Sequence, residues 1–308
     1  MPGRRPPYRS VRLSPFVQHT LARSVQLHGL GVHSGARARL TARPAPAATG
    51  IVFQRTDLAQ GDRRIPATGD AVTDTRLGTT IANGDGVSVA TIEHLMAVCS
   101  GLAIDNAIIE IDGPEAPILD GSAAPFVEAI DRGGRRSQGA PRRYIEVIHP
   151  IEVQDGERRA ALLPAEQFEV EFEIAFDCSV IGRQRIDLAV DEAAFREELA
   201  DCRTFGFLRE VEALRAAGLA RGGALDNVVV IGEGRVLNPG GLRRADEFVR
   251  HKALDAIGDL YLLGAPLLAR YEGRYAGHAL NNALVRRVMA SPERWRYARA
   301  RQDLALAV

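Results

Sequence analysis

The chain has 308 residues, a length that allows two domains or one large domain at about 100–200 residues per domain. Its 39 lysine and arginine residues balance 39 aspartate and glutamate residues, so the formal net charge is zero. This balance provides no overall positive field to attract nucleic acid or anionic lipid. Hydrophobic residues make up 46% of the chain, which is typical of a globular protein with a substantial core.

The three cysteines, Cys99, Cys178 and Cys202, lie far apart and form no CxxC pair. This pattern excludes a disulfide framework and a structural zinc knuckle, and it favours a reducing compartment. No run of 18 apolar residues occurs, and the basic start is not followed by the apolar region of a signal peptide. We therefore expect a cytoplasmic protein with no integral membrane segment.

The first half of the sequence is predicted to consist mostly of short strands. Four prolines within residues 1–20 predict a loose N-terminal arm, and the NGD turn at 83–85 predicts a hairpin. Thr91 is placed as the N-cap of a helix that ends near Gly101, and Ser122 as the cap of a second helix. Strands are predicted at 24–29, 37–43, 51–55, 78–82, 86–90 and 106–111.

The second half repeats this order of strands followed by helices. Residues 134–143 are rich in Gly, Arg and Pro, have almost nothing to bury, and predict a linker. Alternating apolar residues over 168–176, with glutamates between them, predict a half-exposed strand. A long helix is predicted over 245–263 and ends at Gly264. The other predicted elements are strands at 151–154, 158–163, 227–231 and 267–275, and helices at 192–200, 208–217 and 279–290.

These elements predict an α+β protein of two similar domains, each with an antiparallel sheet packed on helices. We place an N-terminal arm at 1–20, domains at 21–133 and 144–299, a linker at 134–143 and a C-terminal tail at 300–308. Strands and helices do not alternate regularly, which argues against a doubly wound sheet or a TIM barrel.

The predicted long helix carries a polar stripe in its most apolar part. His251 and Asp255 are four residues apart, so their side chains share a helix face and could bind one ion. Asp259 lies four residues further along and could orient a ligand. Lys252 is the only lysine against 38 arginines, which suggests a contact that the wider guanidinium cannot make. A buried His–Asp hydrogen bond and chance retention of one lysine are the alternatives.

Two other histidines have unusual neighbours. Glu93 and His94 stand in the first turn of a predicted helix, where negative charge is favoured. Adjacent helical side chains point about 100° apart, so these two can flank one point, one as metal ligand and one as base. His278 lies between a strand and the last helix. The alternatives are a charged helix start, a partly buried polar histidine and a histidine that caps a helix.

Other catalytic patterns, such as GxSxG or a Walker A loop, do not occur in the sequence. The run GLGVHSG at 29–35 is similar to a dinucleotide-binding glycine pattern with one extra residue, but no helix is predicted after it.

Read together, these segments resemble the zinc-dependent UDP-3-O-acyl-N-acetylglucosamine deacetylases of lipid A biosynthesis. The resemblance extends from about Val25 to Met289. The matching stretches are GLGVHSG (29–35), RPAPAATGIVFQRTD (43–57), TIEHLMA (91–97), GLAIDNAIIEIDGPEAPILDGSAAPFV (101–127), RTFGFLREVEALRAAGLARGG (203–223), RVLNPGGLRRADEFVRHKALDAIGDLYLLG (235–264) and GHALNN (277–282).

The resemblance implies a catalytic role for several residues. Glu93 would be the base, and His278 the second catalytic histidine. Thr204 would help to hold the oxyanion. One catalytic Zn²⁺, completed by a water, would have as its protein ligands His94, His251 and Asp255.

The resemblance also implies how the substrate is held. Lys252, Phe205 and Phe207 match substrate-binding positions, and Asp259 matches a residue that supports the site. Arg274 stands where some members have a lysine that reaches the diphosphate. Some members also have a cysteine near the metal within 74–80, and this chain has none there.

The implied fold has two layered α+β domains, with the active site at their interface and residues 208–230 in an insert for the acyl chain. The implied reaction is hydrolysis of the acetamide on the glucosamine C2 nitrogen, which releases acetate in an early committed step of lipid A biosynthesis. The implied partner is the UDP-linked acylated glucosamine, and no obligate protein partner is evident.

Two other functions stay open at this point. One is a zinc amidase of the same fold that acts on another N-acyl sugar. The other is a non-catalytic nucleotide-sugar-binding protein with a structural metal. Glu93 and His278 argue against the second, because a structural site needs no free base.

Overall fold

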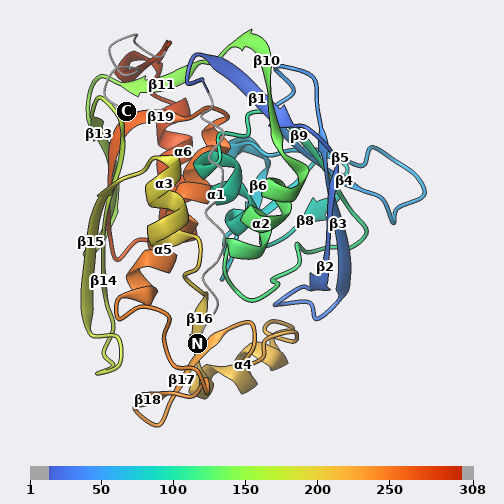
Figure 1. Cartoon of the computed structure of the whole chain (residues 1–308). Helices are drawn as coiled ribbons and strands as arrows, with labels where there is room; N and C mark the ends of the chain where they lie inside the picture. Colours follow the sequence, from blue (N-terminus) through green and yellow to red (C-terminus); the bar gives the residue numbers. More distant parts are fainter. Residues whose placement is uncertain (1–13, 300–308) are drawn as a thin grey trace, which may run out of the picture.

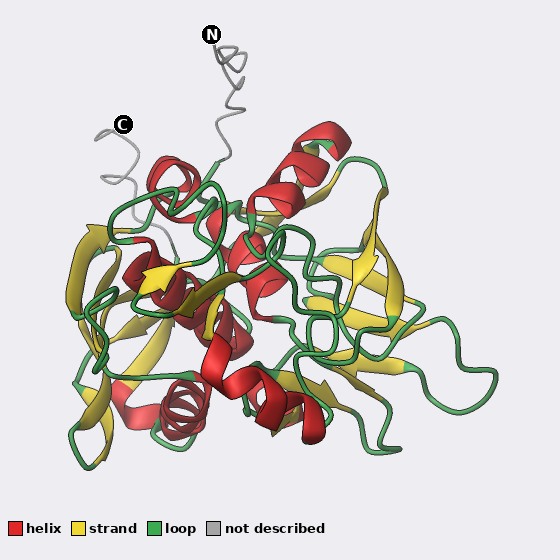
Figure 2. Ribbon diagram, turned by 90° about the horizontal axis from the view of Figure 1, so that it is seen from below, coloured by secondary structure: helices red, strands yellow, loops and turns green. Residues whose placement is uncertain are grey.

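The computed structural model describes residues 14–299 of the chain. Two sheets stand on opposite sides of the molecule, and helices fill the space between them (Figure 1, Figure 2). This arrangement confirms the predicted α+β class. Residues 1–13 of the predicted arm and the predicted tail at 300–308 lie outside the described residues.

The sheet of the first half has five strands in the order β2-β3-β9-β4-β5. Its neighbours run antiparallel except β4 and β9, which are parallel, so the sheet is mixed. Its strands are β2 (Val25–Leu30), β3 (Arg37–Pro44), β9 (Ala107–Ile111), β4 (Ile51–Arg55) and β5 (Arg64–Pro66). A separate three-stranded sheet, which includes the predicted hairpin, consists of β6 (Val72–Asp74), β7 (Thr80–Ala82) and β8 (Ser88–Val89), after the short helical turn η1 (Gly69–Ala71).

The sheet of the second half has seven strands. Its central strand β19 runs parallel to β11 and β14 and antiparallel to β13, so this sheet is also mixed. The alternation predicted near 168–176 is confirmed, because Val170, Phe172 and Ile174 are buried. The strands are β11 (Tyr144–Val147), β12 (Ile151–Asp155), β13 (Arg158–Pro164), β14 (Phe168–Ala175), β15 (Arg183–Ala189), β19 (Leu267–Arg274) and β20 (Trp295–Ala298), the last preceded by η5 (Pro292–Arg294).

Two segments that the sequence predicts to be loose form strands instead. β1 (Val17–Leu21) overlaps the end of the predicted arm and pairs antiparallel with β10 (Arg135–Pro141), which occupies most of the predicted linker. Backbone hydrogen bonds hold this pair, so the Gly-, Arg- and Pro-rich composition of 134–143 gives no sign of it. The expectation of loose structure at both places was wrong, while the domain boundaries themselves stay a prediction.

Both predicted helix caps donate their hydroxyl to a carboxylate, and only Ser122 also contacts its helix. The hydroxyl of Thr91, a residue with φ of +57°, donates to Oε1 of Glu115 at 2.9 Å. Helix α1 (Glu93–Gly101) therefore begins without a side-chain cap. Ser122 donates to Asp120 at 2.8 Å, and its hydroxyl oxygen also accepts from the N–H of Ala124, the first residue of α2 (Ala124–Gly133), at 3.3 Å. A carboxylate is a strong acceptor for a hydroxyl proton, and sequence spacing does not reveal the partner of Thr91, which lies 24 residues away.

Two of the helices between the sheets, α1 and the long helix of the second half, are buried over almost their whole length. The predicted long helix is confirmed as α5 (Glu247–Leu260) with η4 (Tyr261–Leu263), and it ends at Gly264, whose φ is +80°. A Cβ at Gly258 would lie 2.0 Å from the carbonyl oxygen of Glu93, so only glycine allows α5 to approach α1 this closely. The remaining helices of this layer are α3 (Glu192–Ala194), its π-helical continuation η2 (Phe195–Leu199), and α6 (His278–Met289).

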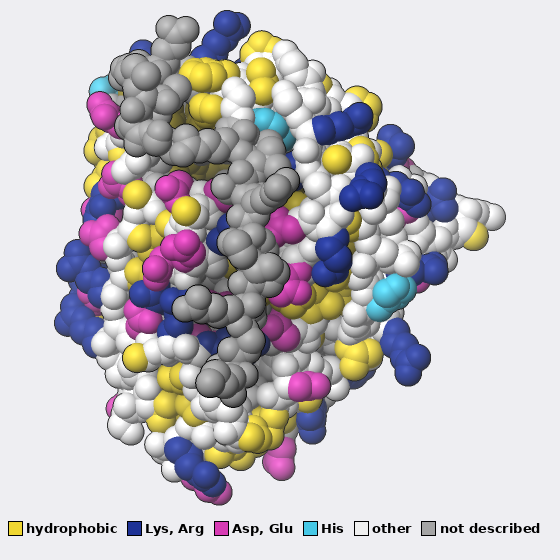
Figure 3. All heavy atoms as spheres, viewed as in Figure 1, with side chains coloured by type: hydrophobic (Ala, Val, Ile, Leu, Met, Phe, Trp, Pro, Cys, Tyr) yellow, Lys and Arg dark blue, Asp and Glu magenta, His cyan; other side chains and the backbone are white. Residues whose placement is uncertain are grey.

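A smaller unit stands at one end of the molecule (Figure 1). It contains a three-stranded sheet and the helix predicted at 208–217. On the face shown in Figure 3, apolar side chains gather over this end, whereas acidic and basic side chains elsewhere lie intermixed. Its elements are β16 (Phe205–Phe207), η3 (Leu208–Glu210), α4 (Val211–Ala216), β17 (Val229–Gly232) and β18 (Arg235–Val236).

None of the helices described between residues 14 and 299 combines the length and the apolar character needed to cross a membrane.

Candidate metal and catalytic site

The structure brings the three predicted metal ligands together. Nε2 of His94 lies 3.5 Å from Oδ1 of Asp255, and Nε2 of His251 lies 3.4 Å from the same oxygen. All three side chains are buried, and Oδ1 of Asp255 has no hydrogen-bond partner among the described residues. A buried carboxylate oxygen is costly to leave unpaired, whereas a cation placed between these groups would satisfy it. Two imidazoles and a carboxylate with an open position fit a catalytic zinc ion.

Neighbouring groups fix the orientation of these ligands. Nδ1 of His251 lies 3.1 Å from the carbonyl oxygen of Cys202, which can only accept, so the proton belongs on Nδ1 and Nε2 is free for a metal. Burial lowers the pKa of His251 to about 4, so its imidazole is neutral at pH 7. Lys252 donates from Nζ to the other oxygen of Asp255 at 2.8 Å. Helix spacing alone predicted that His251 and Asp255 meet, and this is confirmed.

Glu93 and His278 lie beside the three ligands. Glu93 is 3% exposed, and Oε2 of its carboxylate accepts from the backbone N–H of Thr79 at 2.9 Å. Burial raises its pKa. Nε2 of His278 lies 3.8 Å from Oδ2 of Asp255, so the imidazole faces the same point. The site therefore contains a buried carboxyl and a buried imidazole in addition to the ligand set.

Asp259 lies behind His278 and controls its charge. Its Oδ2 is 2.9 Å from Nδ1 of His278. Burial by itself would lower the pKa of His278, but the Asp259 carboxylate outweighs burial and raises it to about 9. The Asp259 carboxylate therefore favours the protonated form of His278.

Three polar residues that the sequence did not single out complete this network. The hydroxyl of Thr79 donates to Oδ1 of Asp259 at 2.6 Å, and the amide of Asn281 donates to Oδ2 at 2.8 Å. The hydroxyl of Tyr271 donates to Oδ1 of Asn281 at 2.7 Å. Asn281 stands three residues after His278, and this spacing could have marked it as a candidate site residue. Thr79 lies in a loop far from Asp259 in the sequence, and no local pattern marks it as a site residue.

A cavity of about 930 Å³ opens onto these groups. Its wall continues from the polar end into the smaller unit, where Leu208, Leu214 and Leu237 line it. Of the predicted site residues, those in the wall are Glu93, His94, Thr204, Phe205, Phe207, His251, Lys252, Asp255 and His278.

Two predicted residues lie outside this wall. Asp259 is behind His278, and the Arg274 guanidinium stacks over the ring of Tyr275, 5.1 Å from its centre. Phe176 was missed as a wall residue, although its ring lies 5.7 Å from that of Phe205. Segment 74–80 contributes Thr75 and Leu77 to the wall.

Known proteins resemble this chain over most of its length. The model of the family described as UDP-3-O-acyl N-acetylglycosamine deacetylase matches residues 18–290. A Phenylobacterium zucineum (strain HLK1) protein named UDP-3-O-acyl-N-acetylglucosamine deacetylase is 62% identical over 291 residues, which cover 94% of this chain and 99% of that protein. A protein of the same name from Myxococcus xanthus (strain DK1622) is 49% identical over 292 residues, which cover 95% and 92%.

Proposed function

Because the chain belongs to the UDP-3-O-acyl N-acetylglycosamine deacetylase family, we propose that it hydrolyses the N-acetyl group of UDP-3-O-(3-hydroxyacyl)-N-acetylglucosamine. This is the deacetylation step of lipid A biosynthesis. We place the reaction in the cytoplasm and assign it one catalytic zinc ion.

The observation that carries this proposal is the meeting of two imidazole Nε2 atoms at an otherwise unpartnered oxygen of Asp255. We assign the zinc ligands to His94, His251 and Asp255, whose candidate ligand atoms lie within 4.8 Å of one another. When bound there, zinc supplies a Lewis acid for the acetamide carbonyl and lowers the pKa of a water molecule.

Glu93 and His278 then divide the proton transfers between them. The Glu93 carboxylate takes a proton from the attacking water. As the C–N bond of the acetamide breaks, protonated His278 gives a proton from Nε2 to the departing C2 amine, while Asp259 holds Nδ1. The hydroxyl of Thr204 stabilises the developing oxyanion from the cavity wall. The products are acetate and the free amine.

The remaining predicted residues bind substrate in this proposal. The ammonium of Lys252 faces polar groups of the UDP-linked sugar, and Phe205 and Phe207 contact its apolar part. The apolar wall in the smaller unit receives the acyl chain. Arg274 takes the diphosphate role only if the Tyr275 stack opens, because it does not line the cavity.

The test is acetate release by the zinc-loaded protein from the UDP-linked acylated substrate. We expect release that a chelator abolishes and added zinc restores. Glu93→Gln should keep the metal and lose most activity. Equal rates on free N-acetylglucosamine would favour an amidase of wider range. Substrate binding without acetate release would favour a non-catalytic sugar-binding protein and contradict the proposal.

A further inference from the structure

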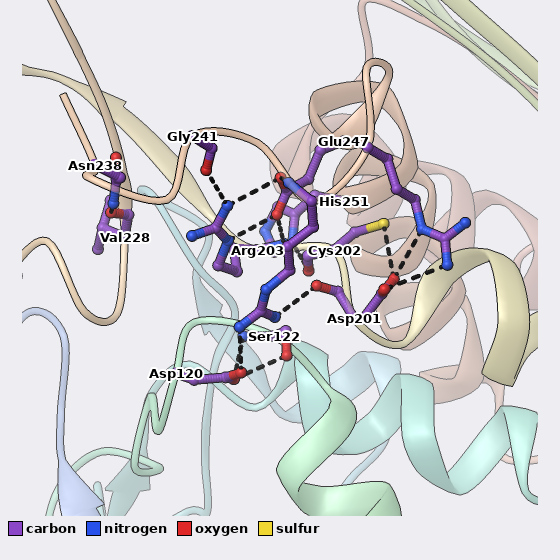
Figure 4. A network of polar contacts seen from close by, with 12 residues as sticks. Asp120, Ser122, Asp201, Cys202, Arg203, Val228, Asn238, Gly241, Glu247 and His251 are labelled. Atoms are coloured by element: carbon purple, nitrogen blue, oxygen red, sulfur yellow. Dashed lines mark hydrogen bonds and ion pairs between the residues drawn. The ribbon is translucent and has the colours of Figure 1, made fainter. Parts of the chain in front are cut away.

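One buried peptide group, which joins Cys202 to Arg203, contacts two residues of α5 that are one helical turn apart. Its N–H donates to Oε1 of Glu247 at 3.0 Å. Its carbonyl oxygen accepts from Nδ1 of His251 at 3.1 Å. Figure 4 shows Glu247, His251, Cys202 and Arg203 gathered around this peptide. The orientation of one peptide plane therefore sets which nitrogen of His251 carries the proton.

Glu247 holds this peptide with a fully buried carboxylate. Oε1 accepts from the backbone N–H and from Nε of Arg203, and the second of these distances is 2.8 Å. Oε2 accepts from a terminal guanidinium nitrogen of Arg203 at 3.1 Å and from the N–H of Arg243 at 2.7 Å. Four donors thus satisfy the carboxylate, and charge-assisted bonds of this kind are strong and directional.

The flanking backbone prevents the peptide from following a displaced Glu247. The N–H of Cys202 donates to the carbonyl of Leu199 at 3.0 Å. The N–H of Thr204 donates to the carbonyl of Gly121, and its carbonyl accepts from the N–H of Val229, both at 2.8 Å. With both neighbours fixed, the freedom that remains is rotation of the Cys202–Arg203 peptide plane, and Glu247 is the side chain that holds its N–H.

We propose that Glu247 is a positioning residue for the metal ligand His251. By holding the Cys202–Arg203 peptide, it keeps the carbonyl acceptor against Nδ1 and thereby presents Nε2 of His251 to the metal. The inference rests on the proposed metal site. Removal of a group that orients a metal-bound histidine typically weakens metal affinity by about 10- to 100-fold.

Glu247→Gln tests this directly. In either orientation of the glutamine amide, its NH₂ group faces two of the four N–H groups that donate to the Glu247 carboxylate. The bonds that hold the Cys202–Arg203 peptide are therefore disrupted, although the side chain keeps its shape. We expect the zinc dissociation constant, measured by competition with a chromophoric chelator, to rise by about 10- to 100-fold. The kcat of the zinc-saturated variant should fall more than its KM rises.

Glu192→Gln is the matched control. The Glu192 carboxylate also accepts from two arginines, Arg135 and Arg196, but these bonds join it to side chains and not to the Cys202–Arg203 peptide that Glu247 holds. Its loss should lower the free energy of unfolding while the zinc dissociation constant stays within about twofold of the wild-type value. Unchanged zinc affinity in folded Glu247→Gln, or an equal loss in both variants, would overturn the proposal.

A measurement on the wild-type protein keeps the proposal testable if Glu247→Gln does not fold. The ¹⁵N shifts of His251 in the metal-free protein should show a neutral imidazole protonated at Nδ1. Protonation at Nε2 instead would overturn the proposal. Failure of the metal site itself would be seen separately, as full zinc binding by Asp255→Ala.

Discussion

Helices α5 and α1 both supply the site, but they hold their residues in different ways. On α5, His251, Asp255 and Asp259 recur every four residues, so the helix itself sets their spacing. On α1, Glu93 and His94 are adjacent and diverge, and they follow Thr91, a residue with positive φ. The loop before α1 and its contact with α5 set their position. One half of the site is thus encoded locally and the other half by packing.

The contact between the two helices is the most sensitive point of this arrangement. In Gly258→Ala the new Cβ would meet the backbone carbonyl of Glu93, which cannot move as a flexible side chain can. We expect a loss of about 3 kcal/mol in the free energy of unfolding, together with weak zinc binding. Urea unfolding of the metal-free protein measures it.

Gly84→Ala is the control, because nothing lies within 4 Å of a Cβ at Gly84. Its unfolding free energy should stay within about 0.5 kcal/mol of the wild-type value. If Gly258→Ala were as stable as Gly84→Ala, close packing would not be what joins α1 to α5.

Asp259, the last residue of the polar stripe on α5, should affect the catalytic rate and not metal binding. Asp259→Asn removes the anion that holds Nδ1 of His278. We expect kcat to fall by about 100-fold while the protein still binds zinc. Metal analysis and steady-state kinetics on the same preparation separate the two effects. Loss of zinc in parallel with activity would place Asp259 among the groups that bind the metal.

The lone lysine should not tolerate arginine. Nζ of Lys252 reaches Oδ2 of Asp255 as a compact charge, whereas a guanidinium is wider, planar and forked. We expect Lys252→Arg to lower kcat/KM at least about tenfold, or roughly 1.4 kcal/mol. The reverse exchange at Arg250→Lys is the control, because Arg250 pairs away from the cavity with Asp246 and Glu198. Normal kinetics in Lys252→Arg would leave the single lysine to chance.

The smallest expected effect is a pH dependence of the free energy of unfolding, which arises from Glu247, the first residue of α5. Burial opposes the charge of Glu247, but the bonds from Arg203 outweigh burial and lower its pKa. Its contribution to stability is therefore fully present above its unfolded pKa, about 4.3, and is lost as the pH falls through the folded value.

The difference in unfolding free energy between wild type and Glu247→Gln shows this dependence. In metal-free protein the difference should shrink as the pH falls from about 7 to below about 4.3. A difference that stays constant over that range would mean that the carboxylate is not held in its charged form by Arg203.

The same contrast explains how much the sequence could predict. Residue periodicity predicts the α+β class, the alternation in β14 and the whole α5 stripe. It does so because periodicity is a local property of the sequence that does not depend on distant contacts. The meeting of His251 with Asp255 needed only helix spacing. That His94 joins them was implied by the resemblance and not by the residues themselves.

The remaining features depend on contacts between distant segments. Thr91 has the residue type of a helix cap, but Glu115 accepts its hydroxyl proton and α1 begins without a side-chain cap. The pairing of β1 with β10 is made by backbone groups that carry no side-chain signature. Thr79 and the Cys202 carbonyl reach the site across long sequence separations, so no local pattern marks them.

The central claim is that one oxygen of Asp255, with His94 and His251, binds the catalytic zinc ion. Zinc content of purified Asp255→Ala, measured beside the wild type and Asp259→Asn, tests it most directly. We predict zinc well below one per chain in Asp255→Ala, and close to the wild-type content in Asp259→Asn. Full zinc in folded Asp255→Ala would contradict the assignment of the site.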